Sequence, residues 1–343
     1  MLKSDAVGCI AALKAFSDPS DSDASPQAFA PAPASWYYLG SVSEIAAAPR
    51  RFDLPDGHSY VAFRAPGQPV AVLGGRCSHM GADLSLGCVK SGRIVCPLHG
   101  WEYGSNGDCE HIPAAPEIPP FARQPSFPVE ERCGHVFFFN RLEARFPFPF
   151  FTGLRETDLL AARPFEFTVD APWHLVSANG FDVQHFRCAH DRTLLGEPAV
   201  DSPHPFAWRL RAKFRVTGTS LRDRITRLFS GSELEMTVEN WCGNLVLVTA
   251  KFRRTTSYGL VSFAPLDKNR TTVRNIVFVP RSRNRVVRWL IDPLDAIIRR
   301  SFIREFVRSD VNRSAGIRFH PDRMIAADKV LAEYLGWLQN IHR

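Results

Sequence analysis

Two short segments, each with one cysteine and one histidine, constrain this chain more than any other feature. The first reads CSH (residues 77–79) and the second reads CPLH (residues 96–99), with 16 residues between them. Two thiolates and two imidazoles on tight loops can hold a binuclear [2Fe-2S] cluster, with Cys77 and Cys96 on one iron and His79 and His99 on the other. The chain therefore has to fold so that two loops meet across a metal centre.

Structural zinc is the alternative for the same four side chains. A zinc finger normally carries two cysteines on one arm and two histidines on the other. Here each arm carries one of each, which favours the binuclear cluster. Nearby glycines let the backbone bend and turn N–H groups toward the sulfurs. They are Gly74, Gly75, Gly81 and Gly100.

The segments CSHMGADLSLG and CPLHGWEYGSNGDC resemble the Rieske domain of oxygenases, and the resemblance covers residues 36–140. Rieske proteins of cytochrome complexes carry an extra disulfide, whose cysteines would fall at Ala82 and Leu98 in this sequence. Their absence indicates the oxygenase type. Cys88 and Cys109 receive no ligand role, and we expect both to be buried thiols.

A second constellation, Asp182-x2-His185-x4-His190, lies about 80 residues further on. On a helix Asp182 and His185 share a face, whereas His185 and His190 are five apart, so we expect the helix to bend or end between them. Paired histidines on a helix are more often an ordinary surface or core pair. The upstream Rieske ligands favour a metal site here.

Two histidines and one carboxylate leave positions on iron open for O2. We expect Asp310 to be the carboxylate, because it lies in a long helical pattern at a separation from His190 that resembles the family's. A solvent-facing carboxylate near Arg308 and Arg313 is the ordinary alternative for Asp310. Asp292 and Asp295 are weaker candidates.

The resemblance implies roles for several neighbours of these ligands. Asp182 would bridge His185 and the cluster ligand His99 of an adjacent subunit, which implies a head-to-tail ring, most often a homotrimer. Asn179 matches a position near the iron. Candidate substrate-pocket residues are Phe181 and Phe186, and the role of His174 is left open.

The predicted fold class is α+β. We expect a flexible leader over 1–34, an all-β Rieske [2Fe-2S] domain over 35–140, a connector over 141–164 and a catalytic mononuclear iron domain over 165–343. The catalytic domain should be a helix-grip (START-like) fold, with a curved antiparallel sheet and helical patterns at 173–190, 284–317 and 322–341.

Composition narrows the remaining classes. The net charge of +7 is compatible with an acidic protein partner but does not indicate nucleic-acid binding. The arginines of 281–288 and 299–304 alternate with apolar residues, as on the solvated faces of amphipathic helices. No apolar run is long enough for a membrane span, and eight cysteines are too few for a disulfide scaffold, so we expect a cytoplasmic protein.

The motifs are most similar to those of single-subunit-type Rieske oxygenases, with a Rieske stretch similar to steroid ketone hydroxylases and cholesterol desaturases. This implies electrons from NAD(P)H through a separate reductase, with or without a ferredoxin, and O2 as co-substrate at Fe(II). Monohydroxylation of a hydrophobic substrate is the first choice; demethylation, desaturation and ring dihydroxylation use the same parts. A Rieske electron carrier without oxygenase activity and a zinc-binding module are the competing classes.

Overall fold

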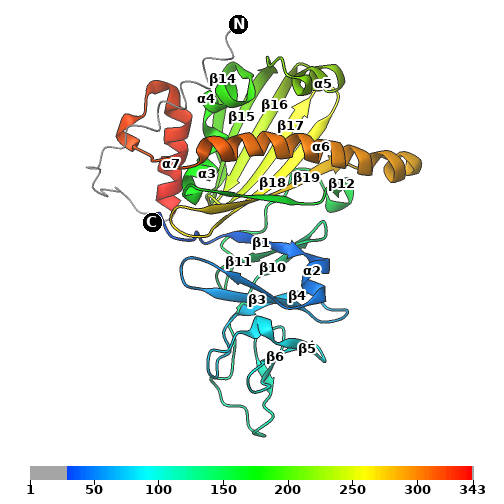
Figure 1. Cartoon of the computed structure of the whole chain (residues 1–343), viewed down its shortest axis with the longest axis vertical. Helices are drawn as coiled ribbons and strands as arrows, with labels where there is room; N and C mark the ends of the chain where they lie inside the picture. The colour runs from blue at the N-terminus through cyan, green and yellow to red at the C-terminus, as the bar shows by residue number, and fades with distance from the viewer. Residues whose placement is uncertain (1–28, 342–343) are drawn as a thin grey trace.

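The computed structural model describes residues 29–341, with a β-rich N-terminal part and a larger part built on one curved sheet (Figure 1). The N-terminal part holds three small antiparallel sheets and the short helix α2 (Val42–Ala47). In pairing order, the strands are β1 (Trp36–Ser41), β11 (His135–Phe139) and β10 (Val129–Arg132); β2 (Arg50–Asp53), β3 (Ser59–Arg64), β4 (Val70–Gly74) and β9 (Ser126–Phe127); and β5 (Cys88–Lys90), β6 (Arg93–Val95), β7 (Glu102–Tyr103) and β8 (Cys109–His111).

The larger part is an antiparallel sheet of eight strands. In pairing order they are β12 (Leu159–Ala161), β19 (Thr271–Pro280), β18 (Thr256–Pro265), β17 (Leu245–Phe252), β16 (Glu233–Trp241), β15 (Ala207–Val216) and β14 (Arg192–His204), with β13 (Phe165–Val169) also paired to β19. Successive side chains of a strand point to opposite faces, so every second residue of β16 to β19 faces the helices that cover one side of the sheet.

One long helix dominates that side. The helices are α3 (Trp173–Ala178), α4 (Val183–His190), α5 (Leu221–Phe229), α6 (Arg285–Ser314) and α7 (Lys329–Ile341). Asn284 caps α6, since its Oδ1 accepts the backbone N–H groups of Val286 and Val287 at 2.9 and 3.3 Å. In Figure 1 α6 crosses the sheet, and its first turns project beyond the sheet edge.

The two parts share a hydrophobic core. Trp36 of β1 packs with Phe146 and with residues of the large sheet. Its indole N–H donates to the Phe146 carbonyl at 3.2 Å, and the Asn244 side chain donates to the Trp36 carbonyl at 2.9 Å. These buried bonds, with partners more than 100 residues apart, fix the small sheets to the large sheet.

The α+β prediction is confirmed, with β sheets followed by a curved antiparallel sheet holding a long helix. The helices α2 and α5 are additional to the helical patterns expected. The helical pattern expected over 173–190 is divided into α3 and α4 by a 3₁₀ turn, Asn179–Phe181.

The predicted connector and the described end of the predicted leader both pack against the rest of the protein. Residues 141–164 include β12, and Phe146, Phe148 and Phe151 are buried. The expected leader lies mostly outside the described residues, but the described part of it begins with Phe29 and Ala30, which contact α3. Phe29 stacks on His174 with ring centroids 4.1 Å apart. Burial of these aromatic rings outweighs the loop-like composition.

The loops that follow β4 and β6 lie at the end of the molecule opposite α4 (Figure 1). The two predicted metal constellations are therefore well separated within one chain. Among the described residues, no helix combines the length and apolar character needed to cross a bilayer.

A substitution at Gly243 tests how tightly α3 and α7 pack on the sheet. Its φ is +86°, and an added Cβ would lie 2.4 Å from Cζ3 of Trp173 and 2.7 Å from Cδ1 of Leu338. We expect Gly243→Ala to destabilise the protein by about 2–4 kcal/mol, from left-handed strain plus overpacking. Gly134→Ala is the matched control, with φ +79° and no atom within 4 Å, and should cost only about 1 kcal/mol. Equal shifts in the urea midpoint for the two variants would contradict this packing account.

Candidate metal centres

The two Cys-His loops have the same backbone design. Cys77 donates its N–H to a carbonyl five residues later at 2.8 Å, and its own carbonyl accepts the N–H of Gly81 at 2.8 Å. Cys96 repeats both bonds, at 2.8 Å and, from Gly100, at 3.0 Å. Gly81 and Gly100 have φ of +72° and +70°, a conformation that glycine adopts without steric cost. The repeated Cys-x3-Gly spacing is what closes both loops.

The four side chains of these loops meet at one tip. The side chains of Cys77 and Cys96 are buried, and those of His79 and His99 are exposed, with ring centroids 4.8 Å apart. The His79 ring also stacks on Trp101 at 4.5 Å and 3°, which fixes its orientation. Burial raises the pKa of the Cys96 thiol, while backbone N–H groups of its loop work in the opposite direction.

The chemistry of this donor set fits a [2Fe-2S] cluster. The Tyr103 hydroxyl lies 3.1 Å from Sγ of Cys77, and burial raises the pKa of Tyr103 so that it remains a donor. Donors aimed at sulfur are a normal feature of iron–sulfur sites and raise their potential. Buried thiols with N–H and O–H donors, beside two solvent-facing imidazoles, match the asymmetric ligand set of a Rieske centre.

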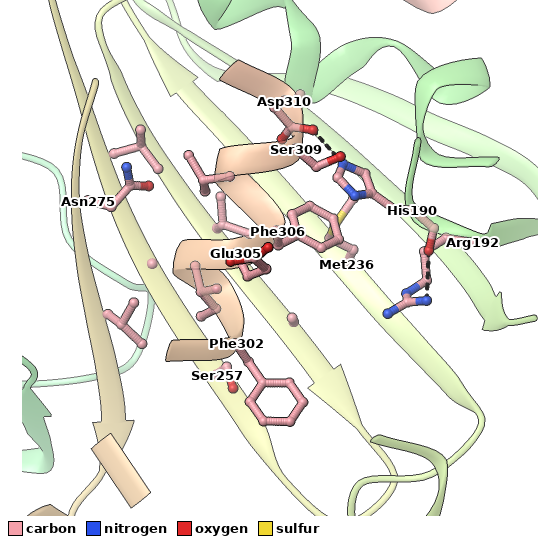
Figure 2. A pocket seen from close by; sticks show the side chains of 18 of the residues that line it. His190, Arg192, Met236, Ser257, Asn275, Phe302, Glu305, Phe306, Ser309 and Asp310 are labelled. Atoms are coloured by element: carbon pink, nitrogen blue, oxygen red, sulfur yellow. Dashed lines mark hydrogen bonds and ion pairs between the residues drawn. The ribbon is translucent and has the colours of Figure 1, made fainter. Parts of the chain in front are cut away.

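The second constellation converges on one point between α4 and α6. The Nε2 atoms of His185 and His190 are 3.1 Å apart, and Oδ1 of Asp310 lies 2.8 Å from the first and 2.7 Å from the second. Figure 2 shows Asp310 and His190 reaching toward each other from the two helices. Among the described residues, these three form the one group whose ligand atoms all lie within 4.8 Å of one another.

These separations fit a metal with three ligands on one octahedral face. Nitrogen and oxygen ligands lie about 2.1 Å from such a metal, so two ligand atoms at a right angle are about 3.0 Å apart. Tetrahedral angles would put them at about 3.4 Å. The observed 2.7–3.1 Å favours the facial arrangement of two histidines and one carboxylate.

The protonation states also suit a metal. Burial lowers the pKa of the His190 imidazole, although Asp310 opposes this. Burial would raise the pKa of the Asp310 carboxyl, but hydrogen bonds from His185 and His190 outweigh it, and the pKa lies below its ordinary value. The neutral His190 imidazole interacts with the ionised Asp310 carboxylate by a hydrogen bond rather than as an ion pair. The carboxylate is in its metal-binding form, and the imidazole can present a bare Nε2 to a metal when its proton is on Nδ1.

The prediction that the helix bends or ends between His185 and His190 is wrong. α4 runs unbroken from Val183 to His190 and ends directly after it, where Asp191 adopts a left-handed conformation with φ 53°. The rings converge because imidazole side chains are long enough to reach one point from different sides of a two-turn helix. Phe306 of α6 stacks on the His190 ring at 3.4 Å and 11°.

Asp182 and Asn179 stand at the entry to α4. Asp182 is its N-cap, and its Oδ1 accepts the backbone N–H of His185 at 3.0 Å. The Asn179 amide lies 3.3 Å from Nε2 of His185, so it is close to the convergence point. His174 lies further off against Phe29, and burial lowers its pKa to about 4.

A cavity of about 860 Å³ opens beside the three converging side chains and lies between the curved sheet and α6 (Figure 2). Side chains spaced four residues apart on α6 line one side of the cavity and form a stripe along the helix. They are Ile298, Phe302, Phe306 and Asp310. Phe186 lines the cavity, as expected. Phe181 does not, because its ring is fully buried and stacks on Tyr334 of α7 at 4.1 Å.

Asn275 is a cavity residue that the sequence did not single out. It lies on β19, only 3% exposed, and its Nδ2 has no hydrogen-bond partner in the described structure. Figure 2 shows the amide among the side chains that line the cavity. An unpaired buried donor costs about 1–3 kcal/mol, so a ligand that accepts its hydrogen bond would recover that cost.

The alternative carboxylates are engaged elsewhere. Asp292 accepts the N–H and the hydroxyl of Ser282, at 2.8 and 2.6 Å. Asp295 pairs with Arg299 at 2.8 Å. Neither joins the histidine pair. Cys109 is buried as expected, but Cys88 is exposed.

The sequence of residues 35–126 matches the family model described as the Rieske [2Fe-2S] domain. This match confirms the predicted Rieske domain. A probable 3-ketosteroid-9-alpha-monooxygenase, oxygenase component, of Rhodococcus rhodochrous is 39% identical over 103 residues, 30% of this chain and 26% of that protein. Methylxanthine N1-demethylase NdmA of Pseudomonas putida is 32% identical over 164 residues, 46% of this chain and 43% of that protein. These alignments span less than half the length of the curated relatives.

Solved structures extend the likeness of fold over nearly the whole chain. Dicamba monooxygenase bound to dicamba has a TM-score of 0.64 and 18% identity, covering 92% of this chain and 99% of that one. NdmA of Pseudomonas putida CBB5 has a TM-score of 0.67 and 22% identity, covering 90% of each. At this identity the likeness establishes the fold of both parts.

Removing the carboxylate should empty one centre and spare the other. We expect Asp310→Ala to lower the iron content of the purified holoprotein from three to two atoms per chain, with acid-labile sulfide unchanged at two, because the clusters of ligands are far apart. Asp295→Ala, on the same helix, is the matched control and should retain three. Iron analysis and sulfide assay check this, and parallel loss of sulfide in Asp310→Ala would contradict two independent centres.

Proposed function

We propose that this chain, a relative of the catalytic components of Rieske non-haem iron oxygenases, is a terminal oxygenase that hydroxylates a hydrophobic organic substrate. The observation that carries the proposal is the convergence of His185, His190 and Asp310 at the wall of an apolar cavity, downstream of a Rieske domain. A bare electron carrier would have no use for that second site or for the cavity.

In this proposal Cys77, His79, Cys96 and His99 hold the [2Fe-2S] cluster, and His185, His190 and Asp310 hold Fe(II). When bound, the two centres supply stored electrons and activation of O2. The protein's own contribution is placement. Asp310 and the two imidazoles occupy one side of the metal position and leave the cavity side free, while Phe306 stacked on His190 limits water access.

Electrons would have to enter from outside the chain. The Rhodococcus relative is described as an oxygenase component, which supports a separate NAD(P)H-dependent reductase, with or without a ferredoxin.

A neighbouring copy would complete the path. The separation of the two constellations within one chain (Figure 1) supports a homotrimer in which His99 of one subunit approaches Asp182 of the next. Asp182 suits a bridging role, because one oxygen already accepts the His185 N–H and so holds the carboxylate at the start of α4. A carboxylate between two imidazoles would fix the orientation of both rings.

The cavity supports an apolar substrate that carries a hydrogen-bond acceptor. Its lining is mostly aliphatic and aromatic, and Asn275 offers an unpaired donor. Monohydroxylation is proposed first, and the relatives named as a monooxygenase and as an N1-demethylase support monooxygenation or demethylation. Desaturation and ring dihydroxylation remain the other outcomes of the same site.

The direct test uses reconstituted holoprotein, a purified NAD(P)H-dependent reductase and ferredoxin, and a panel of polycyclic and aromatic ketones. The proposal predicts substrate-dependent O2 consumption and a product 16 mass units heavier, or its demethylated equivalent. Cluster reduction without O2 consumption across the panel, in protein that lacks a third iron, would support the electron carrier instead. Zinc without acid-labile sulfide would support the zinc module.

The substitution Asp182→Asn separates the proposed bridging role of Asp182 from its role as the N-cap of α4. Asparagine is as good an N-cap as aspartate, so α4 and both metals should be retained, but the charge that pairs with two imidazoles is lost. We expect turnover to fall about 10–100-fold with unchanged iron and sulfide content. Stopped-flow reoxidation of the reduced cluster by O2 should slow in parallel. Turnover equal to that of the unaltered protein would remove the bridging role.

Asn275→Leu tests the buried donor. We expect it to weaken binding of a fused-ring ketone such as fluorenone about tenfold, consistent with the loss of one hydrogen bond, and to leave binding of the parent hydrocarbon fluorene unchanged. Ser257→Ala is the matched control, because Ser257 lines the same cavity but already accepts from Arg299 at 2.9 Å. Isothermal titration calorimetry gives both affinities. A similar loss for fluorene would mean that the substitution only disturbs the shape of the cavity.

A further inference from the structure

The first half of α6 and the whole of α5 expose an unusual amount of apolar surface. Eleven of the 21 exposed large apolar residues in the described chain lie on these two helices. We call this group the apolar collar; it consists of Leu221, Ile225, Leu228 and Phe229 of α5 and Val286, Trp289, Leu290, Ile291, Leu294, Ile297 and Ile298 of α6. Several are largely in solvent, with Trp289 77% and Leu221 72% exposed.

The apolar side of α6 faces away from the protein. At about 100° per residue, the collar residues of α6 cover an arc of about 200°. The side that faces the sheet carries Asp292 and Ala296, which are 4% and 3% exposed. Arg285 and Arg288 are exposed, as the predicted solvated basic face requires. The apolar residues of this stretch are exposed as well, because its first turns project beyond the sheet (Figure 1).

The collar adjoins the cavity. Ile225 and Phe229 of α5 and Ile298 of α6 are at once exposed and part of the cavity lining. Arg222 links the two helices by its contact with Glu305 at 3.6 Å. The cavity therefore opens between α5 and α6 and leads inward to Asp310.

The charge around the collar is strongly positive. Residues 221–229 and 281–300 contain nine arginines and three aspartates. Two of the aspartates are buried, Asp223 against Arg192 at 2.8 Å and Asp292 against Ser282. The third, Asp295, is paired with Arg299. The exposed surface thus combines apolar side chains with unbalanced guanidinium groups.

We propose that the apolar collar docks on an anionic lipid surface, so that a hydrophobic substrate passes from the lipid into the cavity. Exposed tryptophan, leucine and isoleucine flanked by arginine are the composition of helices that lie in a bilayer interface, and each arginine near an anionic leaflet adds to the attraction. A symmetric contact between two copies through this face would place two positively charged surfaces against each other, which disfavours self-association. The delivery of substrate rests on the proposed oxygenase function, whereas the docking does not.

Vesicle flotation with the holoprotein tests the docking without any turnover. Vesicles of phosphatidylcholine with 30% phosphatidylglycerol are compared with pure phosphatidylcholine, at 0.1 and 0.5 M NaCl. We expect binding to the anionic vesicles that weakens at high salt and falls at least tenfold in Trp289→Ser/Leu294→Ser. Leu142→Ser/Ile325→Ser is the matched control, since both residues are similarly exposed but lie outside the collar, and it should bind like the unaltered protein.

Two results would overturn the proposal. In the first, the holoprotein does not float with anionic vesicles; in the second, the collar variant and the control variant bind equally well. Analytical ultracentrifugation of the same samples identifies a third case. If the collar variant loses an oligomer that the control keeps, and the oligomer does not bind vesicles, the collar is a contact between copies of this chain. Because flotation needs no substrate, oxygenase activity can fail while docking succeeds, and the reverse.

Discussion

The contact of Asp310 with both histidines of α4 is the constraint on which the functional part of the structure depends. It joins residues that are 120 and 125 positions apart in sequence, and it does so at a single oxygen atom. With a cation between these groups, the same separations are those of three ligands on one face of an octahedron.

The long helix α6 connects this centre to the molecular surface. Its last turns carry Asp310, its middle supplies the aromatic stripe of the cavity, and its first turns carry most of the apolar collar. The curved sheet provides the opposite wall, and Arg299 ties the helix to it through bonds to Thr255, Thr256 and Ser257. One helix thus sets the distance between the cavity mouth and the site of reaction.

The candidate ligand sets could be proposed from the sequence because their spacing is local. Cys-x-His, Cys-x2-His and Asp-x2-His-x4-His each lie within one loop or one short helix, so the chain itself brings the residues together. Asp310 was reached only through the resemblance to a known family, since no local pattern relates it to His190. Regular strands such as β3, β4 and β11 follow from apolar runs between turn residues.

What the sequence missed depends on tertiary packing. Phe181 and Phe186 both stand next to a residue of the Asp182-x2-His185 motif, so the sequence does not distinguish them. In the structure Phe181 lies in the core against Tyr334, whereas Phe186 lines the cavity. Asn275 gives no local signal, because its unpaired amide is evident only once the sheet and α6 enclose it. The exposed apolar arc of α6 could not be foreseen either, since helical periodicity predicts an apolar face but not whether anything covers it.

The account depends most on the presence of two separate iron centres in one chain. Anomalous diffraction at the iron edge, from crystals of anaerobically purified holoprotein, tests this directly. We predict two separate peaks per chain, one between the loops of Cys77 and Cys96 and one within bonding distance of His185, His190 and Asp310. A map with the first peak alone, or with a zinc-edge signal at either position, would contradict the oxygenase account.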